Sequence, residues 1–185
     1  MNIRKMLKSD IPQAEYICLA TADKKLKCDE KQKQTTLLLY NRYYTRAALD
    51  SCFVLTDEND CAVGYILCTP SYKVYKKEFC KTELRKLTTI SPQAFFNGIS
   101  CLLGNMPYAK DYPAHMHIDI LPEYQAKGYG GKLLLALCEH LKSSGVPGLM
   151  LIVDSKNFNA VKFYKKHGFK EIKALAGGII MGVKL

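Results

Sequence analysis

The sequence predicts a mixed α/β fold formed by one domain of 185 residues. Three observations carry this prediction. Strand-like and helix-like segments alternate along the chain, residues 114–121 read as a strand with one polar face, and the apolar run at residues 149–153 is typical of a strand buried on both faces. With 48% hydrophobic residues, the chain is long enough for one sizeable core and short for two full domains. We therefore expect a single domain over residues 1–185.

The first half of the chain predicts a strand, two helices and a hairpin. Ser9 and Asp10 followed by Pro12 are typical of a helix cap with proline in the first turn. Two apolar runs flank the polar turn at residues 56–60, which favours a β-hairpin. The expected elements are a strand over residues 1–7, a helix over 11–20, a helix within 31–44, and hairpin strands over 51–55 and 62–68.

Residues 69–112 form an irregular segment in which aromatic residues stand among lysines and prolines. Short helices are expected near residues 76–87 and 92–103. Long segments of this kind are uncommon in compact domains and often carry function. We therefore interpret residues 69–112 as an insertion that builds a surface or a pocket wall.

The second half alternates strands and helices more clearly. Apolar and polar side chains alternate over residues 114–121, which predicts a strand with one polar face. The apolar face holds Met116, Ile118 and Ile120, and the polar face holds His115, His117 and Asp119. The remaining expected elements are a helix over 132–141, a buried strand over 149–153, a helix over about 157–167, and a closing hairpin over 169–175 and 179–185.

Between the polar-faced strand and the next helix lies a turn that contains Gly128, Gly130 and Gly131. Such a turn directs unpaired N–H groups outward, and the helix dipole adds partial positive charge there. Glycine admits positive φ angles and lets a phosphate approach without meeting a Cβ atom. The spacing matches neither a dinucleotide-binding fingerprint nor a Walker A loop. The turn is predicted to bind an anion, and a tight turn without a ligand is the alternative.

Two motifs in this order carry a family resemblance. Gln125-x-x-Gly128-x-Gly130 follows the polar-faced strand, and Asn157-x-x-Ala160-x-x-Phe163-Tyr164-x-x-x-Gly168-Phe169 comes later in the chain. Together they resemble the GNAT superfamily of N-acetyltransferases, and most closely its stand-alone bacterial members related to the acetyltransferase-like domain of O-GlcNAc hydrolases. The resemblance implies a GNAT-like fold with a central mixed sheet of six to seven strands, helices on both faces, and a helical insertion between strands 3 and 4 that shapes the acceptor site.

The resemblance also implies acetyl-CoA as the cosubstrate. In the family, the glycine loop wraps the pyrophosphate, a bulge in the preceding strand frees main-chain groups for the pantetheine arm, and an asparagine contacts the same arm. The residues implied to bind acetyl-CoA are Ile120, Leu121, Gln125, Ala126, Lys127, Gly128, Tyr129, Gly130, Gly131, Lys132, Asn157 and Tyr164. The alternatives are solvated surface positions for Lys127 and Lys132 and a helix N-cap for Asn157, which is compatible with contact to the arm.

The implied reaction transfers acetyl directly to a primary amine. Tyr164 matches the family tyrosine that often protonates the departing thiolate, with a core aromatic position as the alternative. His117 and Asp119 are the leading candidates for the base, and the alternatives are an ordered water or a structural His–Asp pair. The three polar-face residues could also be read as metal ligands, but the family needs no metal and we expect none.

The formal charge of +10 favours an anionic partner, small or large. Only four of the 27 basic residues are arginine, which argues against specific recognition of nucleic acid. No segment resembles a signal peptide or a membrane span, and the eight cysteines match neither a zinc site nor a catalytic Cys/His motif. We expect a cytoplasmic protein with free thiols that is a monomer or homodimer. Two other functions stay open, a non-catalytic acetyltransferase-like module that binds a partner through residues 69–112, and a non-specific nucleic-acid binder.

Overall fold

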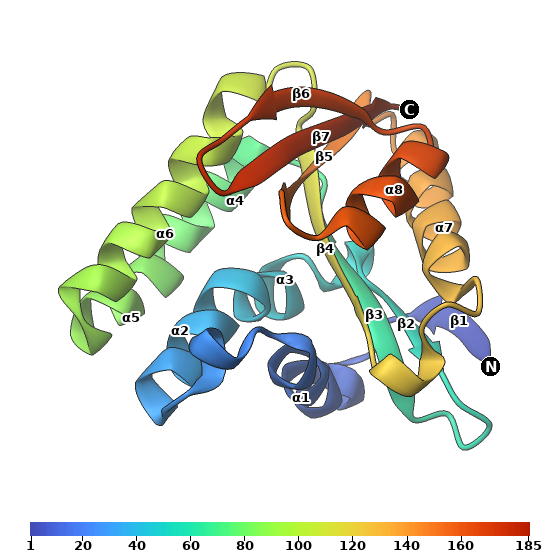
Figure 1. The fold of residues 1–185 in the computed structure, drawn as a ribbon, viewed down its shortest axis with the longest axis horizontal. Coiled ribbons are helices and arrows are strands. Elements are labelled where there is room, and N and C mark those ends of the chain that lie inside the picture. The colour runs from blue at the N-terminus through green and yellow to red at the C-terminus, as the bar shows by residue number, and fades with distance from the viewer.

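A computed structural model describes residues 1–185 and contains one seven-stranded sheet (Figure 1). The strands lie in the order β1-β2-β3-β4-β5-β7-β6, and only the β4–β5 pair is parallel. The bounds are β1 (Asn2–Lys5), β2 (Phe53–Thr56), β3 (Ala62–Thr69), β4 (Ala114–Ile120), β5 (Gly148–Asp154), β6 (Lys170–Ala174) and β7 (Gly178–Lys184). This mixed sheet confirms the predicted α/β fold with seven strands.

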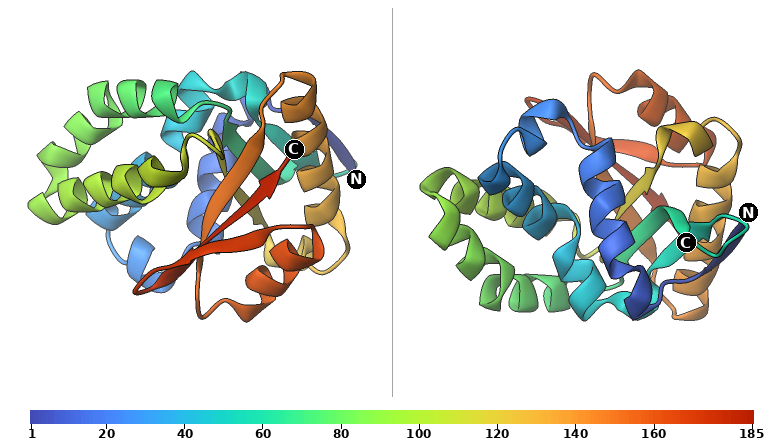
Figure 2. Two further views of the ribbon diagram at one scale, coloured as in Figure 1. Left: turned by 90° about the horizontal axis from the view of Figure 1, so that it is seen from above. Right: turned by 90° about the horizontal axis from the view of Figure 1, so that it is seen from below.

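The chain forms eight α-helices. Figure 2 shows helices on both faces of the sheet and a group of helices that extends to one side of it. The eight helices are α1 (Ile11–Thr21), α2 (Glu30–Tyr40), α3 (Arg42–Ala47), α4 (Tyr72–Lys81), α5 (Glu83–Ile90), α6 (Pro92–Asn105), α7 (Tyr129–Ser143) and α8 (Phe158–Lys166). Asp119 of β4 lies beside α1, whereas the side chain of Ile120 approaches Gly130 of α7. Because neighbouring residues of a strand point to opposite faces, α1 and α7 cover opposite faces of the sheet. No helix combines the length and the apolar character needed to cross a bilayer.

The β4 and β5 strands pair only at one end. Ala114 pairs with Leu149 and His115 with Met150, and no further residues of the two strands are paired. Beyond these pairs the strands diverge, while β4 stays paired with β3 from His115 to Ile120 and β5 stays paired with β7 over its whole length. The divergence opens a cleft in the middle of the sheet, between the half formed by β1–β4 and the half formed by β5–β7.

Two helices that the sequence predicts as continuous are interrupted. The helix expected within residues 31–44 divides into α2 and α3 at Asn41, whose buried side-chain amide donates to the Ala14 carbonyl at 3.1 Å. The helix expected near residues 76–87 divides at Thr82, where the chain turns the Glu83 carboxylate inward. Arg46 binds that carboxylate through two nitrogens at 3.1 Å, so the buried charge is paired. These tertiary contacts leave no signal in local periodicity.

The bulge implied for the strand that ends near Leu121 is absent. The β3–β4 register runs without a shift from the Gly64–Ile120 pair to the Thr69–His115 pair. A register shift occurs instead between β2 and β3, at Leu55 and Thr56. The cleft therefore results from divergence of β5 from β4 and does not require an extra residue in β4.

Candidate active site

The loop between β4 and α7 presents a row of unpaired backbone donors. None of the N–H groups from Ala126 to Gly131 donates to an acceptor in the protein, and the Lys132 N–H is the first to be used, bonding the Gly128 carbonyl at 3.3 Å. Ala126 and Gly128 both have positive φ angles, 58° and 82°. The two positive φ angles, at alternate residues, turn the successive N–H groups into a concave nest, and the first turn of α7 adds its dipole. This geometry is that of an anion-binding site at a helix N-terminus.

The three glycines of the loop serve different purposes. Only Gly128 has a positive φ, and a Cβ atom there would face open space. Gly130 and Gly131 lie within α7. A Cβ atom at Gly130 would come within 3.3 Å of the Phe163 ring of α8, and one at Gly131 within 2.7 Å of Nε2 of His167, the residue that caps the end of α8. The expectation that all three supply positive φ angles is therefore wrong for Gly130 and Gly131. These two let α7 and α8 approach closely, and Gly128 alone keeps the nest open.

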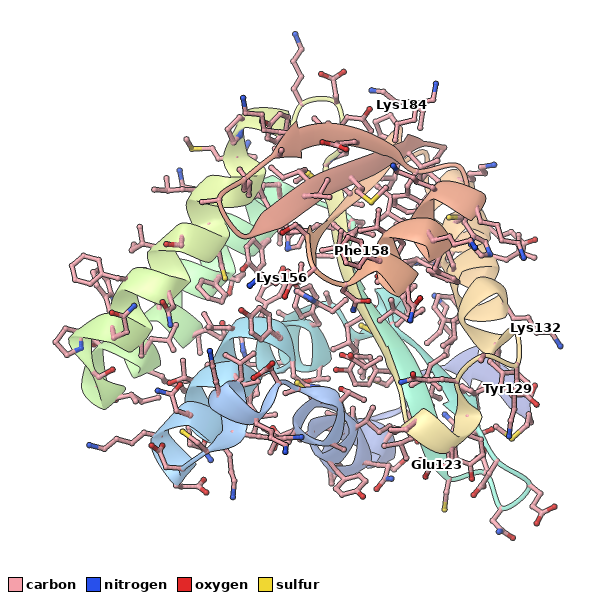
Figure 3. All side chains as sticks on the ribbon, in the orientation of Figure 1. Glu123, Tyr129, Lys132, Lys156, Phe158 and Lys184 are labelled. Carbon is pink, nitrogen blue, oxygen red and sulfur yellow. The ribbon has the colours of Figure 1, made fainter.

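Gln125 secures the loop rather than adding a donor to the nest. Its side-chain nitrogen donates to the Ile120 carbonyl at 2.6 Å, and its backbone N–H donates to the Pro122 carbonyl at 3.2 Å. The two lysines beside the nest are exposed, and each ammonium lies 5.7–5.8 Å from the centre of a tyrosine ring, Lys127 from Tyr124 and Lys132 from Tyr129. Figure 3 shows Lys132 extending from α7 into solvent. Both lysines are free to turn toward an anion in the loop.

The end of β4 offers two main-chain donors to the cleft. The Leu121 N–H donates to the Val63 carbonyl at 3.0 Å and its carbonyl accepts from Tyr124, so both of its main-chain groups are occupied. Hydrogen-bonding direction alternates along an antiparallel strand, so the main chain of Ile118 and Ile120 points away from β3, toward the cleft. The Ile120 carbonyl binds Gln125, which leaves the N–H groups of Ile118 and Ile120 facing the cleft. Of the two residues the sequence suggested here, Ile120 fits a main-chain contact and Leu121 does not.

Asn157 and Tyr164 lie on the β5 side of the cleft. Asn157 caps α8, because its side-chain oxygen accepts the Ala160 N–H at 3.1 Å, and its side-chain nitrogen makes no bond within the protein. Tyr164 is 9% exposed and packs between Phe163 and Phe169. Burial, together with the negative charge of Asp119, raises the pKa of Tyr164 above its usual range. Its hydroxyl makes no hydrogen bond with another protein group and stays protonated at neutral pH.

The cleft opens into a cavity of about 830 Å³ on the face of the sheet that carries His115 and His117. Its walls come from α2 and α3, from α4 and α6 of the insertion, from β4 and β5, and from the β6–β7 turn. Aromatic, histidine and acidic residues contribute to its lining, namely Tyr40, Tyr44, Tyr75, His115, His117 and Asp154. Residues 69–112 thus supply one wall of the cavity.

The polar-face residues of β4 differ in their surroundings. His117 borders the cavity between the rings of Tyr40 and Tyr44, whose centroids lie 5.4 and 5.2 Å away. Burial lowers the pKa of His117 to about 4, so its ring is neutral at pH 7. Asp119 lies outside the cavity lining, accepts a 2.6 Å hydrogen bond from Tyr65, and has its pKa raised to about 6 by burial. No group of three His, Cys, Asp or Glu side chains in the chain is arranged to hold a metal ion.

His115 is the most unusual of the three. It is 3% exposed, and neither ring nitrogen has a hydrogen-bond partner. Burial, with a smaller contribution from His117, lowers the pKa of His115 to about 3. A buried polar group without a partner costs about 1–3 kcal/mol, so this residue weakens the fold in the absence of a bound molecule.

Acidification from pH 7 to pH 5 is expected to lower the free energy of unfolding by up to about 2 kcal/mol through His115. Unfolded histidine binds a proton below about pH 6.5, whereas folded His115 does so only near pH 3, so the unfolded state binds more protons in this window. His117 acts in the same direction. Asp119 partly offsets both, because its raised pKa makes the folded state bind a proton first. Urea unfolding at pH 7 and pH 5 measures this change in the free energy of unfolding. The decrease should be smaller in His115→Leu than in the wild type, and an equal decrease would contradict the role of His115 in the pH dependence.

Several residues around the cleft carry no signal in local sequence patterns. Tyr40, Tyr44 and Tyr75 line the cavity from separate segments, and Asp154 ends β5 beside them. Phe158, at the start of α8 next to Asn157, leaves 78% of its surface exposed (Figure 3).

Comparison with known proteins identifies the family of this chain. The profile of the acetyltransferase (GNAT) family matches residues 19–169. A mycothiol acetyltransferase of Nocardiopsis dassonvillei is 40% identical over 52 residues, a match that spans 28% of this chain and only 16% of the relative.

Two solved structures share the fold. A crystal structure of a protein designated SsHAT is 25% identical and superimposes with a TM-score of 0.88, covering 99% of this chain and 97% of the other. The PaiA N-acetyltransferase of Thermoplasma acidophilum, solved in complex with coenzyme A, is 16% identical with a TM-score of 0.61, covering 100% of this chain and 98% of the other. The family profile spans the cleft, the nest and Tyr164, and the whole sheet is shared. The chain belongs to the acetyltransferase (GNAT) family.

Proposed function

We propose that this protein is an acetyl-CoA-dependent N-acetyltransferase that transfers acetyl directly to a primary amine. The observation that carries the proposal is the row of unpaired N–H groups from Ala126 to Gly131 at the mouth of the β4–β5 cleft. This nest suits the pyrophosphate of acetyl-CoA, and the exposed ammonium groups of Lys127 and Lys132 suit its phosphates. The N–H groups of Ile118 and Ile120 and the free side-chain nitrogen of Asn157 suit the amides of the pantetheine arm.

The proposed reaction needs two proton transfers. The amine nitrogen attacks the thioester carbonyl carbon, the new carbon–nitrogen bond forms, and the carbon–sulfur bond breaks. Tyr164 donates its hydroxyl proton to the thiolate, since its raised pKa keeps that proton in place until the sulfur becomes basic. The amine loses its proton toward His117, which is neutral at pH 7, or toward a water beside Asp119. The proton accepted there later returns to Tyr164 through solvent.

Three further expectations are more specific than membership of the family, and they stay predictions. These are the relationship to bacterial proteins that resemble the acetyltransferase-like domain of O-GlcNAc hydrolases, the cytoplasmic location, and a monomeric or homodimeric state. The intact nest favours a working cosubstrate site over a non-catalytic module. That module remains the second outcome of the test below.

Calorimetric titration with acetyl-CoA tests the proposal, with dephospho-acetyl-CoA alongside. We expect micromolar binding of acetyl-CoA and weaker binding of the dephospho compound, because the lysines beside the nest lose one phosphate partner. Thiol release in the presence of primary amines then tests transfer. Binding without thiol release on any amine would favour the interaction module, and no binding at millimolar acetyl-CoA would leave the nest without its proposed ligand.

A further inference from the structure

The chemistry of the cavity beside the cleft restricts the acceptor. The amine must reach the main chain of Ile118 and Ile120 from the face that carries His115 and His117, because this is the face on which the cavity opens. The lining of this cavity therefore selects the molecule that carries the amine. This inference rests on the proposed acetyl transfer and adds the class of acceptor.

Three tyrosines and two histidines form an aromatic wall in the cavity. The Tyr75 and His115 rings meet edge to face at 4.4 Å between centroids, and Tyr44 meets His115 at 5.8 Å. Tyr40 and Tyr44 flank His117 in the same manner. Aromatic groups favour edge-to-face and offset contacts with a further ring. The wall therefore favours a flat aromatic body in the acceptor over a branched or extended polar one.

His115 requires a polar partner that the protein does not provide. A neutral imidazole has one donor and one acceptor nitrogen, and in this buried ring both are unpartnered. A hydroxyl group both donates and accepts, so it can satisfy either nitrogen once the Tyr44 or Tyr75 ring that covers His115 moves aside. From His115 to Ile118 the strand advances about 10 Å. That advance is close to the length of an amine joined by two carbons to a hydroxylated ring.

Charge in the cavity is opposite in sign to charge on the protein. Asp154 is the only lining residue with a formal charge at neutral pH, although the whole chain carries a net charge of +10. Its carboxylate also accepts the backbone N–H of Lys156 at 2.8 Å, which fixes its position at the end of β5. A single carboxylate attracts one ammonium group, while the net positive charge of the chain disfavours a molecule with several.

We propose that the acceptor is a hydroxyaryl-alkylamine, a primary amine joined by a short alkyl chain to a ring that bears a hydroxyl group. The ring lies against Tyr40, Tyr44 and Tyr75, its hydroxyl binds His115, and Asp154 attracts the ammonium group toward the cleft. His115 is then a specificity residue, and the cost of burying it without a partner is offset when the acceptor binds.

A panel of amines tests this class through thiol release from acetyl-CoA. The probes are tyramine, phenethylamine without the ring hydroxyl, spermidine, glucosamine and a peptide with an N-terminal alanine. We expect kcat/KM for tyramine to exceed that for phenethylamine by about tenfold, since a site built to bond a hydroxyl leaves polar groups unpaired without it. Phenethylamine should in turn exceed the three non-aryl probes. The highest kcat/KM with spermidine, glucosamine or the peptide would overturn the class while acetyl transfer stands.

His115→Leu tests the hydroxyl contact itself. We expect the preference for tyramine over phenethylamine to fall below about twofold, while the melting temperature stays the same or rises, because an unpaired buried polar group is removed. If His115 had a purely structural role, the substitution would lower the melting temperature and would reduce kcat/KM equally for both amines. That result would overturn the proposed contact between His115 and the hydroxyl. His140→Leu is the matched control, because His140 contacts Ser51 and Lys5 away from the cavity and its loss should not alter the preference.

Direct binding measurements test the proposed acceptor class and the proposed acetyl-CoA function separately. In the presence of coenzyme A, tyramine should bind in calorimetry and His115→Leu should weaken it about tenfold. Tight binding of coenzyme A without binding of tyramine overturns the acceptor class alone. Absence of acetyl-CoA binding overturns the proposed function, and with it the inference.

Discussion

Gly128→Val is expected to weaken binding of acetyl-CoA by about 100-fold or more. The side chain would project into the open space in front of the nest, where a Cβ atom meets no protein atom but would meet the phosphate. Loss of two charge-assisted hydrogen bonds costs about 3 kcal/mol or more, which corresponds to that factor. Valine at a φ of 82° also strains the backbone. Calorimetric titration with acetyl-CoA measures the effect.

Gly145→Val is the matched control for that substitution. Gly145 also has a positive φ, 69°, and a Cβ atom there also meets open space, but it lies beyond the other end of α7. Both variants should lose similar stability in thermal unfolding, because both place a β-branched residue in the left-handed region. Only Gly128→Val should bind acetyl-CoA more weakly than the wild type. Equal affinity in both variants would mean that the nest does not hold the pyrophosphate.

Tyr164→Phe is expected to slow turnover by about 100-fold while leaving the affinity for acetyl-CoA unchanged. The substitution removes only the hydroxyl, which makes no hydrogen bond within the protein, so the packing against Phe163 and Phe169 remains. Loss of a general acid costs typically 10²–10⁴-fold in rate. Thiol release measures kcat, and calorimetry measures binding.

Tyr72→Phe provides the comparison for a tyrosine outside the site. Its hydroxyl donates to the Leu102 carbonyl at 2.9 Å, so its loss should lower the melting temperature and leave kcat unchanged. Tyr164→Phe should show the reverse pattern, with the melting temperature retained and kcat reduced. Wild-type turnover in Tyr164→Phe would remove Tyr164 as the proton donor and leave water in that role.

The strands and most helices of the second half were predictable because each carries its own periodicity. The alternation over residues 114–121 and the apolar run over 149–153 correspond to β4 and β5. The breaks at Asn41 and Thr82 were not predictable, because distant partners determine them. Asn41 bonds Ala14, and Glu83 next to Thr82 pairs with Arg46.

The glycine loop was predictable in part from the sequence. Its position before a helix predicts the unpaired donors, and the structure has them from Ala126 to Gly131. Whether a given glycine faces a ligand or a neighbouring helix depends on packing, and Gly131 faces His167. The cavity was harder still to predict from the sequence, because its aromatic wall brings Tyr40 and Tyr44 together with Tyr75 from a separate segment, the insertion.

The short parallel connection between β4 and β5 also has a mechanical consequence. Two residue pairs, at Ala114 and His115, are the whole of the pairing between the two halves of the sheet. Each half is stiff, because its own strands are paired along their lengths. Outside the sheet, the halves are also joined where Gly130 of α7 packs against Phe163 of α8. A molecule bound along the cleft would contact both halves and add a connection where the two strands no longer pair.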